Sequence, residues 1–228
     1  MKAIIGGTGF DTLDGIALTQ EYVDTPYGQV ELFRGEGLIF LPRHGSNHHW
    51  APHLIPYRAN VMALHQLGVK EVIAIYAVGS IDERLKPGQV GIVSDFVDLT
   101  GRAERHTFYE NPVRHIEVDQ PFNEELIARL KALKPDLVDA GVYVTTNGPR
   151  LETKAEINFY RNLGFSVVGM TLASEVSLLL EAEMHVAALV YSINWAAGVE
   201  KEFSFLPDEQ LSELKASVTQ LCQSCLLS

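Results

Sequence analysis

The sequence lacks the features of several protein classes. In 228 residues it has 2 cysteines, and no apolar run approaches the roughly 20 residues of a membrane-spanning helix. Cations are few, with 18 Lys and Arg against 29 Asp and Glu and a formal net charge of -11, so the field of the protein repels nucleic acids and anionic membranes. Met1 and Lys2 lead directly into an apolar segment, without the pattern of a signal peptide. We therefore expect a cytoplasmic protein whose partner is a small molecule.

The two cysteines, Cys222 and Cys225, form a Cys-x-x-Cys pair near the end of the last predicted helix. Such a pair serves redox or metal chemistry when it starts a helix beside a strand. Two ligands without a second pair do not make a zinc site. We interpret the cysteines as packing or surface residues, with a redox role or an inter-chain contact as the alternative, and expect no metal site.

Short apolar segments alternate with amphipathic ones, which predicts an α/β fold in a single domain over residues 1–228. The segment 72–78 is continuously apolar, as in strands that are buried on both faces. Helices are predicted around 126–133, 173–184 and 211–221, and a long loop at 100–122. The predicted strands lie at 2–6, 30–33, 37–42, 71–77, 90–97, 141–146, 165–169 and 186–194.

A glycine-rich turn, Gly6-Gly7-Thr8-Gly9, follows the first predicted strand. It lacks the spacing of a dinucleotide fingerprint and the lysine of a P-loop. Glycines let backbone amides turn toward an anion, and the Thr8 hydroxyl adds a donor. A tight turn without a ligand is the alternative.

The pair Arg43-His44 follows the apolar strand at 37–42. A guanidinium and an imidazole at a strand end suit the oxygens of a phosphate. His44 as a purely structural histidine stays open, and we expect the other histidines nearby to be surface or packing residues.

Five motifs occur in the order of one family: GGTG at 6–9, RHG at 43–45, AVGS at 77–80, NGPRLETKAE at 147–156 and GMTLASE at 169–175. By these motifs the chain resembles the trimeric purine nucleoside phosphorylases, in the branch that includes 5'-methylthioadenosine phosphorylase, from residue 3 to about residue 220. The resemblance implies a three-layer α/β/α fold with a mixed central sheet, a homotrimer, no cofactor, and orthophosphate as co-substrate.

Enzymes of this kind cleave an N-glycosidic bond through a ribosyl cation, so their site must place phosphate beneath C1' and stabilise the departing purine. The resemblance implies that Met170 lies against the ribose and that Gly79 also contacts substrate. Met170 as core filler and Thr171 as a helix cap are the alternatives. The phosphate-binding residues implied by the resemblance are Thr8, Arg43, His44, the Ala77 backbone and Thr171.

The expected base pocket departs from the methylthioadenosine enzymes, which carry two aspartates where this chain has Asn194. Glu152 stands where the 6-oxopurine phosphorylases have a glutamate. An amide donates to O6 and accepts from a protonated N7, and a carboxylate accepts N1–H. We expect Asn194 and His44 to be catalytic and the base to be a 6-oxopurine. Asn194 as a turn residue and Glu152 as a helix-start charge stay open.

Two further residues differ from the family. Leu151 replaces a phenylalanine, so base stacking should be weaker, and Tyr76 replaces a small hydroxyl residue near the phosphate.

The 5' end of the substrate is expected to meet apolar side chains. No histidine follows His185, whereas the inosine and guanosine enzymes bind the 5'-hydroxyl with one near the last helix. Phe205 and Leu211 occupy that region and suit a thioether. His115 matches a loop histidine that reaches into the 5' pocket of a neighbouring subunit. These features predict S-methyl-5'-thioinosine as substrate, with hypoxanthine and 5-methylthioribose 1-phosphate as products.

Four other functions stay open at this point. They are phosphorolysis of inosine or guanosine, phosphorolysis of methylthioadenosine, regulation through nucleotide binding without turnover, and dinucleotide-dependent oxidoreduction. Comparing turnover of the candidate nucleosides distinguishes the first two, and the absence of turnover or the binding of NADH would favour the others.

Overall fold

The computed structural model describes residues 1–13, 15–101 and 107–227. Its centre is a nine-stranded sheet in the order β2-β3-β4-β1-β5-β8-β7-β6-β9, in which β9 also pairs with β5. Parallel and antiparallel pairs both occur, so the sheet is mixed, as expected. The strands are β1 Lys2–Gly6, β2 Thr19–Thr25, β3 Gly28–Arg34, β4 Leu38–Pro42, β5 Glu71–Ser80, β6 Val90–Asp98, β7 Val138–Thr145, β8 Val167–Gly169 and β9 His185–Trp195.

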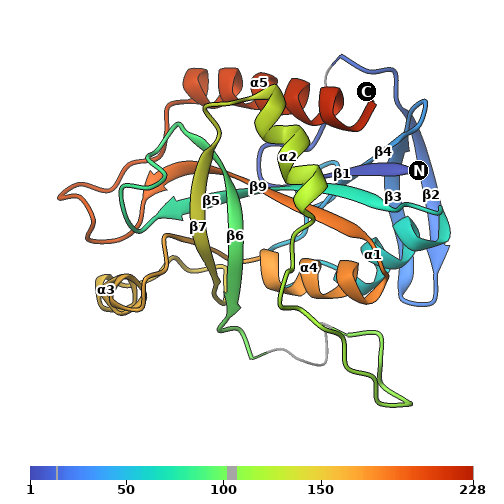
Figure 1. Cartoon of the computed structure of the whole chain (residues 1–228), viewed down its shortest axis with the longest axis horizontal. Coiled ribbons are helices and arrows are strands. Elements are labelled where there is room, and N and C mark those ends of the chain that lie inside the picture. The colour runs from blue at the N-terminus through green and yellow to red at the C-terminus, as the bar shows by residue number, and fades with distance from the viewer. Residues whose placement is uncertain (14, 102–106, 228) are drawn as a thin grey trace.

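Helices cover both faces of the sheet, which confirms the expected three-layer arrangement. Figure 1 shows α2 and α5 along the upper face and α1 and α4 along the lower face. Within the described residues, no helix is both long enough and apolar enough to cross a membrane. The helices are α1 Tyr57–Gln66, α2 Glu124–Leu133, α3 Lys154–Asn162, α4 Leu172–Glu181 and α5 Asp208–Leu227.

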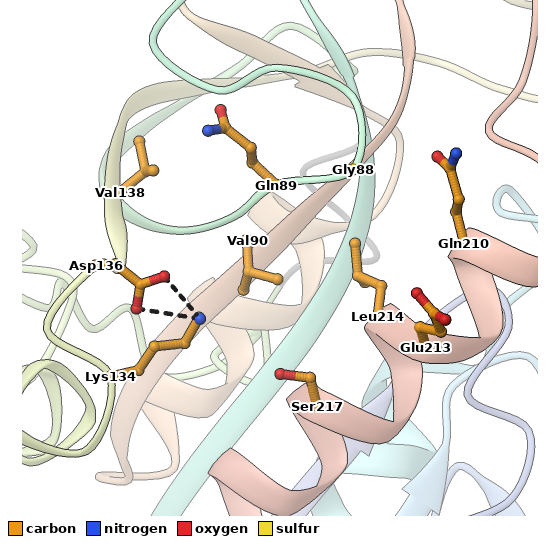
Figure 2. A pocket seen from close by; sticks show the side chains of 10 residues that line it. All are labelled: Gly88, Gln89, Val90, Lys134, Asp136, Val138, Gln210, Glu213, Leu214 and Ser217. Atoms are coloured by element: carbon orange, nitrogen blue, oxygen red, sulfur yellow. Dashed lines mark hydrogen bonds and ion pairs between the residues drawn. The ribbon is translucent and has the colours of Figure 1, made fainter.

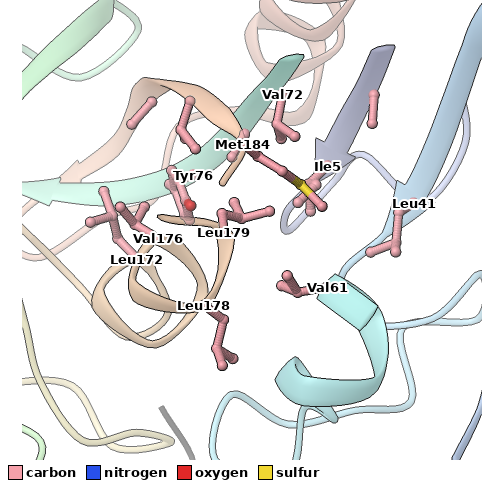
Figure 3. Close-up of a cluster of buried hydrophobic side chains, with 14 of the residues drawn as sticks. Ile5, Leu41, Val61, Val72, Tyr76, Leu172, Val176, Leu178, Leu179 and Met184 are labelled. Atoms are coloured by element: carbon pink, nitrogen blue, oxygen red, sulfur yellow. The ribbon is translucent and has the colours of Figure 1, made fainter. Parts of the chain in front are cut away.

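Strand β5 shows why its sequence is continuously apolar from Val72 to Val78. Val72, Ala74 and Tyr76 belong to the core cluster on the side of α1 and α4, and Figure 3 shows several side chains of this cluster. Ile73 and Ile75 belong to the cluster on the side of α2 and α5. Successive side chains of a strand point to opposite faces, so both faces of β5 are buried.

The cysteine pair lies in α5 as packing residues. Cys222 and Cys225 form no disulfide and are buried in the same cluster as Ile73 and Ile75. Burial raises the pKa of both thiols above the ordinary value. Both cysteines are therefore protonated at neutral pH, which is unfavourable for redox chemistry because the thiolate is the reactive form.

Three elements are found outside the segments predicted from the sequence: β2, α1 and α3. β2 is an edge strand that pairs with β3 alone and is largely exposed, so it carries no apolar run. α3 buries only Ile157 and Tyr160. Its start was readable, because Thr153 and Glu156 form a capping box. The expected loop at 100–122 is found in its described part and leaves the body of the molecule (Figure 1), and residues 102–106 lie outside the described residues.

Four strands end at one edge of the sheet. β4, β1, β5 and β9 are parallel neighbours, so their carboxyl ends point the same way. Ligands of open α/β sheets bind outside such ends. The glycine-rich turn follows β1 and the Arg43-His44 pair follows β4, which places both motifs at this edge.

Candidate active site

The glycine-rich turn and Arg43 are in direct contact. The Arg43 N–H donates to the Gly6 carbonyl at 2.8 Å. A Cβ added to Gly7 would lie 2.5 Å from Arg43 Nη1 and 2.6 Å from the Ile75 oxygen. Glycine is therefore required at position 7 because the guanidinium approaches the backbone closely. The turn also uses Gly9 in the left-handed region, at φ 81°.

Arg43 is fully buried and fixed by three bonds. Its Nε donates to Glu175 Oε1 at 2.8 Å and its Nη2 to Glu175 Oε2 at 2.6 Å, while Nη1 donates to the Ile75 carbonyl at 2.8 Å. Burial by itself lowers the pKa of Arg43, but the Glu175 carboxylate raises it by more, so the pKa lies above its ordinary value. The guanidinium is therefore cationic, and one N–H on each terminal nitrogen is not engaged by these contacts.

His44 is neutral at physiological pH. Its Nδ1 lies 2.7 Å from the Trp50 carbonyl, and a carbonyl only accepts, so Nδ1 carries the proton and Nε2 is the acceptor. Burial lowers the pKa of His44 to about 4, with the nearby Arg43 acting in the same direction and the Trp50 carbonyl opposing it. His44 therefore receives a hydrogen from a ligand rather than offering a second positive charge.

The amino end of α4 lies at the same site as Arg43 and His44. Thr171 is the N-cap residue of α4, yet its side chain makes no capping bond, because the hydroxyl of Thr145 accepts the Ala173 N–H at 3.2 Å. The simple capping role is thus taken by Thr145. Met170 precedes Thr171, and Gly148 has no Cβ that would collide with its sulfur.

A β-bulge in β9 sets the position of Asn194. Val78 lies opposite Ser192, whereas Gly79 lies opposite Asn194. Ile193 is therefore an extra residue in β9. Bulges re-aim side chains and are frequent beside active sites. Without this one, Ile193 would face Gly79.

The amide of Asn194 is oriented by its neighbour. Nδ2 donates to the Trp195 carbonyl at 2.7 Å, and the residue is 6% exposed. A Cβ on Gly79 would be 3.4 Å from Nδ2, so Gly79 leaves the amide just enough room. The second N–H and the carbonyl of the amide remain outside this bond.

Glu152 is held just before α3. The Thr146 hydroxyl donates to its Oε1 at 2.6 Å. The adjoining Thr153 caps α3, and Arg150 pairs with Glu156 of the first turn at 2.9 and 2.7 Å. This network fixes the segment that carries Leu151 and Glu152, and Oε2 of Glu152 lies outside the Thr146 bond.

One cavity of about 520 Å³ brings most of the expected site residues together. Two expected residues are not part of its lining. Leu211 lies at the start of α5 and packs against the core cluster on that side of the sheet, because its helix position faces the interior. His115 is exposed on the segment before α2. The expected residues that line the cavity are Thr8, Arg43, His44, Ala77, Gly79, Leu151, Glu152, Met170, Thr171, Asn194 and Phe205.

The mouth of the cavity is apolar on one side. Phe203 and Phe205 line it and contact each other edge to face, with ring centroids 5.0 Å apart. They are 50% and 56% exposed, and Leu151, which also lines the cavity, is 48% exposed. Glu200 and Lys201 add charged groups to the same rim.

A second cleft, of about 420 Å³, lies on another part of the surface. Figure 2 shows that Lys134 and Asp136 on one side of it bond to each other, while Glu213 lies on α5 on the other side. The single cation of its lining, Lys134, is thus already paired, and the cleft shares no residue with the first cavity. Residues of all five sequence motifs line the first cavity, and no other pocket among the described residues brings all five together. We therefore take this cavity as the candidate active site.

The sequence interpretation missed the role of Glu175. The available signal was an acidic residue in the first turn of the predicted helix 173–184, because a fully buried acid requires a partner. The partner, Arg43, lies 132 positions away. Trp50, whose carbonyl orients His44, carried no sequence signal.

Comparisons with known proteins agree with the fold and the motifs. Residues 2–226 match the profile of the phosphorylase superfamily. A protein of Methanocaldococcus jannaschii named "Probable S-methyl-5'-thioinosine phosphorylase" is 40% identical over 221 residues, 94% of this chain and 86% of that protein. The 6-oxopurine nucleoside phosphorylase of Pyrococcus furiosus is 41% identical over 213 residues, 86% of this chain and 80% of that protein.

A solved structure has the same fold. Methylthioadenosine phosphorylase from Schistosoma mansoni in complex with tubercidin superposes with a TM-score of 0.89 and 29% sequence identity, over 99% of this chain and 90% of that chain.

Proposed function

Because the chain belongs to the phosphorylase superfamily, we propose that it is a pentosyltransferase that cleaves S-methyl-5'-thioinosine with orthophosphate. The products are hypoxanthine and 5-methylthioribose 1-phosphate. One observation carries the proposal: Glu152 and Asn194 line the same cavity as the Arg43-His44 pair. No cofactor enters this reaction, in which orthophosphate is the co-substrate.

The base is recognised by the carboxylate of Glu152 and the amide of Asn194. Oε2 of Glu152 accepts N1–H of hypoxanthine. Asn194 donates its second N–H to O6 and accepts N7–H through its carbonyl. Adenine presents an acceptor at N1 and donors at N6, so both residues would be mismatched. Each buried group left unpaired costs about 1–3 kcal/mol, which favours the 6-oxopurine.

The phosphate is held at the edge formed by β1, β4 and β5. Arg43 donates its two remaining N–H groups, Thr8 and Thr171 add hydroxyls, and Ala77 adds its backbone. His44 accepts the hydrogen of hydrogenphosphate through Nε2, in keeping with its neutral state.

In the reaction, a phosphate oxygen bonds to C1' as the C1'–N9 bond breaks, and the bonding electrons leave with the purine. The proton of hydrogenphosphate balances the proton carried by hypoxanthine. Asn194 stabilises the departing base through N7–H. These tasks are positioning and electrostatic stabilisation, without a covalent intermediate.

The 5'-methylthio group lies against Phe205 at the mouth of the cavity. Phe205 is half exposed in one chain, and His115 lies on a segment that leaves the body of the molecule (Figure 1). We extend the proposal to a homotrimer in which His115 of one subunit completes the 5' pocket of the next. Met170 lies against the ribose, and Leu151 contacts the base less closely than an aromatic ring would.

The test is phosphate-dependent release of free base from four nucleosides, followed by chromatography. We expect kcat/KM to be highest for methylthioinosine, lower for inosine and guanosine, and lowest for methylthioadenosine. Reactions without phosphate are the control and should release no base. Faster cleavage of methylthioadenosine would overturn the assignment of the base, and no release from any nucleoside would favour a binding protein without turnover.

Phosphorolysis of inosine or guanosine is the second candidate. Glu200 and Lys201 line the rim beside Phe205, and either could meet a 5'-hydroxyl. A higher kcat/KM for inosine than for methylthioinosine would identify this activity.

A further inference from the structure

Tyr76 lies behind the proposed phosphate site and does not line the cavity. It is 1% exposed and lies among the buried side chains between β5 and α4, near Val176 and Leu179 (Figure 3). The next residues of β5, Ala77, Val78 and Gly79, line the cavity, whereas Tyr76 belongs to the buried core cluster on the side of α4. Any effect of Tyr76 on phosphate must therefore pass through another residue.

Tyr76 contacts both members of the buried ion pair. Its hydroxyl donates to Glu175 Oε2 at 2.8 Å, and the guanidinium carbon of Arg43 lies 4.2 Å from the centre of its ring. Burial, and next the Glu175 carboxylate, raise the pKa of Tyr76 well above its ordinary value, so the phenol is a permanent donor. The ring of Tyr143 meets Tyr76 edge to face at 6.0 Å and limits its rotation.

The orientation of the Arg43 guanidinium depends on its contacts with Glu175 and Tyr76. Glu175 Oε2 receives two hydrogens, one from Arg43 and one from Tyr76. A guanidinium is planar and rigid, so fixing its bonds to Glu175 and to the Ile75 carbonyl also fixes where its two remaining N–H groups point. The Glu175 carboxylate offsets part of the Arg43 charge that a ligand meets. Binding of phosphate here then depends on directed donors more than on net charge.

We infer that the Tyr76 hydroxyl and the Glu175 carboxylate are positioning residues that aim the free N–H groups of Arg43 at the phosphate. This inference rests on the proposed function for the identity of the anion. It assigns to Tyr76 an indirect role in phosphate affinity and leaves the nucleoside pocket unaffected.

The test begins with the wild-type protein, whose phosphate-dependent turnover establishes the reaction independently of Tyr76. Absence of that turnover would contradict the proposed function. Tyr76→Phe then removes the hydroxyl but keeps the ring over Arg43. We expect the KM for phosphate to rise about 10-fold, the effect of one hydrogen bond to a charged group. The KM for the nucleoside and the kcat at saturating phosphate should stay within about 2-fold of the wild type.

Leu130→Ala is the control for lost stability. Leu130 is fully buried in α2, on the opposite side of the sheet. The Leu130→Ala substitution should lower the thermal midpoint of the protein and leave its KM for phosphate unchanged. A folded Tyr76→Phe protein with an unchanged KM for phosphate, or with equal rises in both KM values, would refute the inference.

Glu175→Gln tests whether the KM for phosphate rises or falls when the support of Arg43 is changed. It also replaces Tyr76→Phe as the test if that variant fails to fold. It removes a negative charge beside Arg43, so binding governed by net charge would tighten and the KM for phosphate would fall. If direction governs, the KM for phosphate rises, because a glutamine side chain cannot accept from both Arg43 nitrogens. With arsenate in place of phosphate, the KM values for the anion should rank the variants in the same order.

Discussion

Replacing Gly7 by alanine tests whether the glycine-rich turn and Arg43 act as one unit. The new Cβ would lie 2.5 Å from Arg43 Nη1 and 2.6 Å from the Ile75 oxygen, and ordinary contacts begin at 3.4 Å. The Ile75 oxygen belongs to β5 in the middle of the sheet and cannot move aside. The turn or the guanidinium must therefore shift.

The magnitude follows from these contacts. Overpacking of a well-packed site costs about 1–3 kcal/mol, and each kcal/mol lowers the thermal midpoint of a domain of this size by about 2–4 °C. Displacing Arg43 also loses a charge-assisted hydrogen bond to phosphate, worth about 1.5–3 kcal/mol. Gly7→Ala should therefore raise the KM for phosphate by about 10- to 150-fold.

Thermal denaturation and steady-state kinetics with varied phosphate measure both effects. Gly164→Ala is the matched control. Its Cβ would enter open space, but its φ of 87° strains any side chain, so it should lose stability without a change in the KM for phosphate. A wild-type KM for phosphate in Gly7→Ala would show that the turn does not position Arg43.

Three further predictions concern the other side chains of the cavity. Asn194→Asp should shift the ratio of kcat/KM from methylthioinosine toward methylthioadenosine by about 5- to 150-fold, because a carboxylate repels O6 and accepts from the 6-amino group; an unchanged ratio would contradict the assignment. Phe205→Ser should lower the preference for methylthioinosine over inosine by about 4- to 15-fold, as expected for losing one or two buried methylene equivalents, measured by the same assay.

Protonation of His44 should lower the free energy of unfolding of the protein in mild acid. Burial lowers the pKa of His44 in the fold to about 4, below the ordinary value of 6.5, so the unfolded chain binds the proton more tightly. Its contribution is therefore complete above about pH 6.5 and is lost as the pH falls toward 4, by roughly 3 kcal/mol. Urea denaturation at pH 7 and pH 5 should show a smaller difference for His44→Gln than for the wild type, and equal differences would exclude this role.

Much of the scaffold was readable from local patterns. The run 72–78 indicated a strand buried on both faces, and β5 has one set of side chains in each core cluster. The family resemblance, rather than a local pattern, implied that the turn after β1 and the Arg43-His44 pair bind one phosphate, and both line one cavity. β2 was missed because an exposed edge strand needs few apolar residues, and α3 because it buries only Ile157 and Tyr160.

By itself, the sequence determined the α/β alternation, the strand ends and the chemistry available at each, because these follow from the spacing of apolar residues and from the nature of the side chains. The tertiary structure decided which of these groups meet. The Arg43–Glu175 pair joins residues 132 positions apart, and the bulge at Ile193 turns Asn194 toward Gly79. Leu211 packs into the core instead of the cavity. Such outcomes depend on strand register and helix packing across the sheet, which no local pattern records.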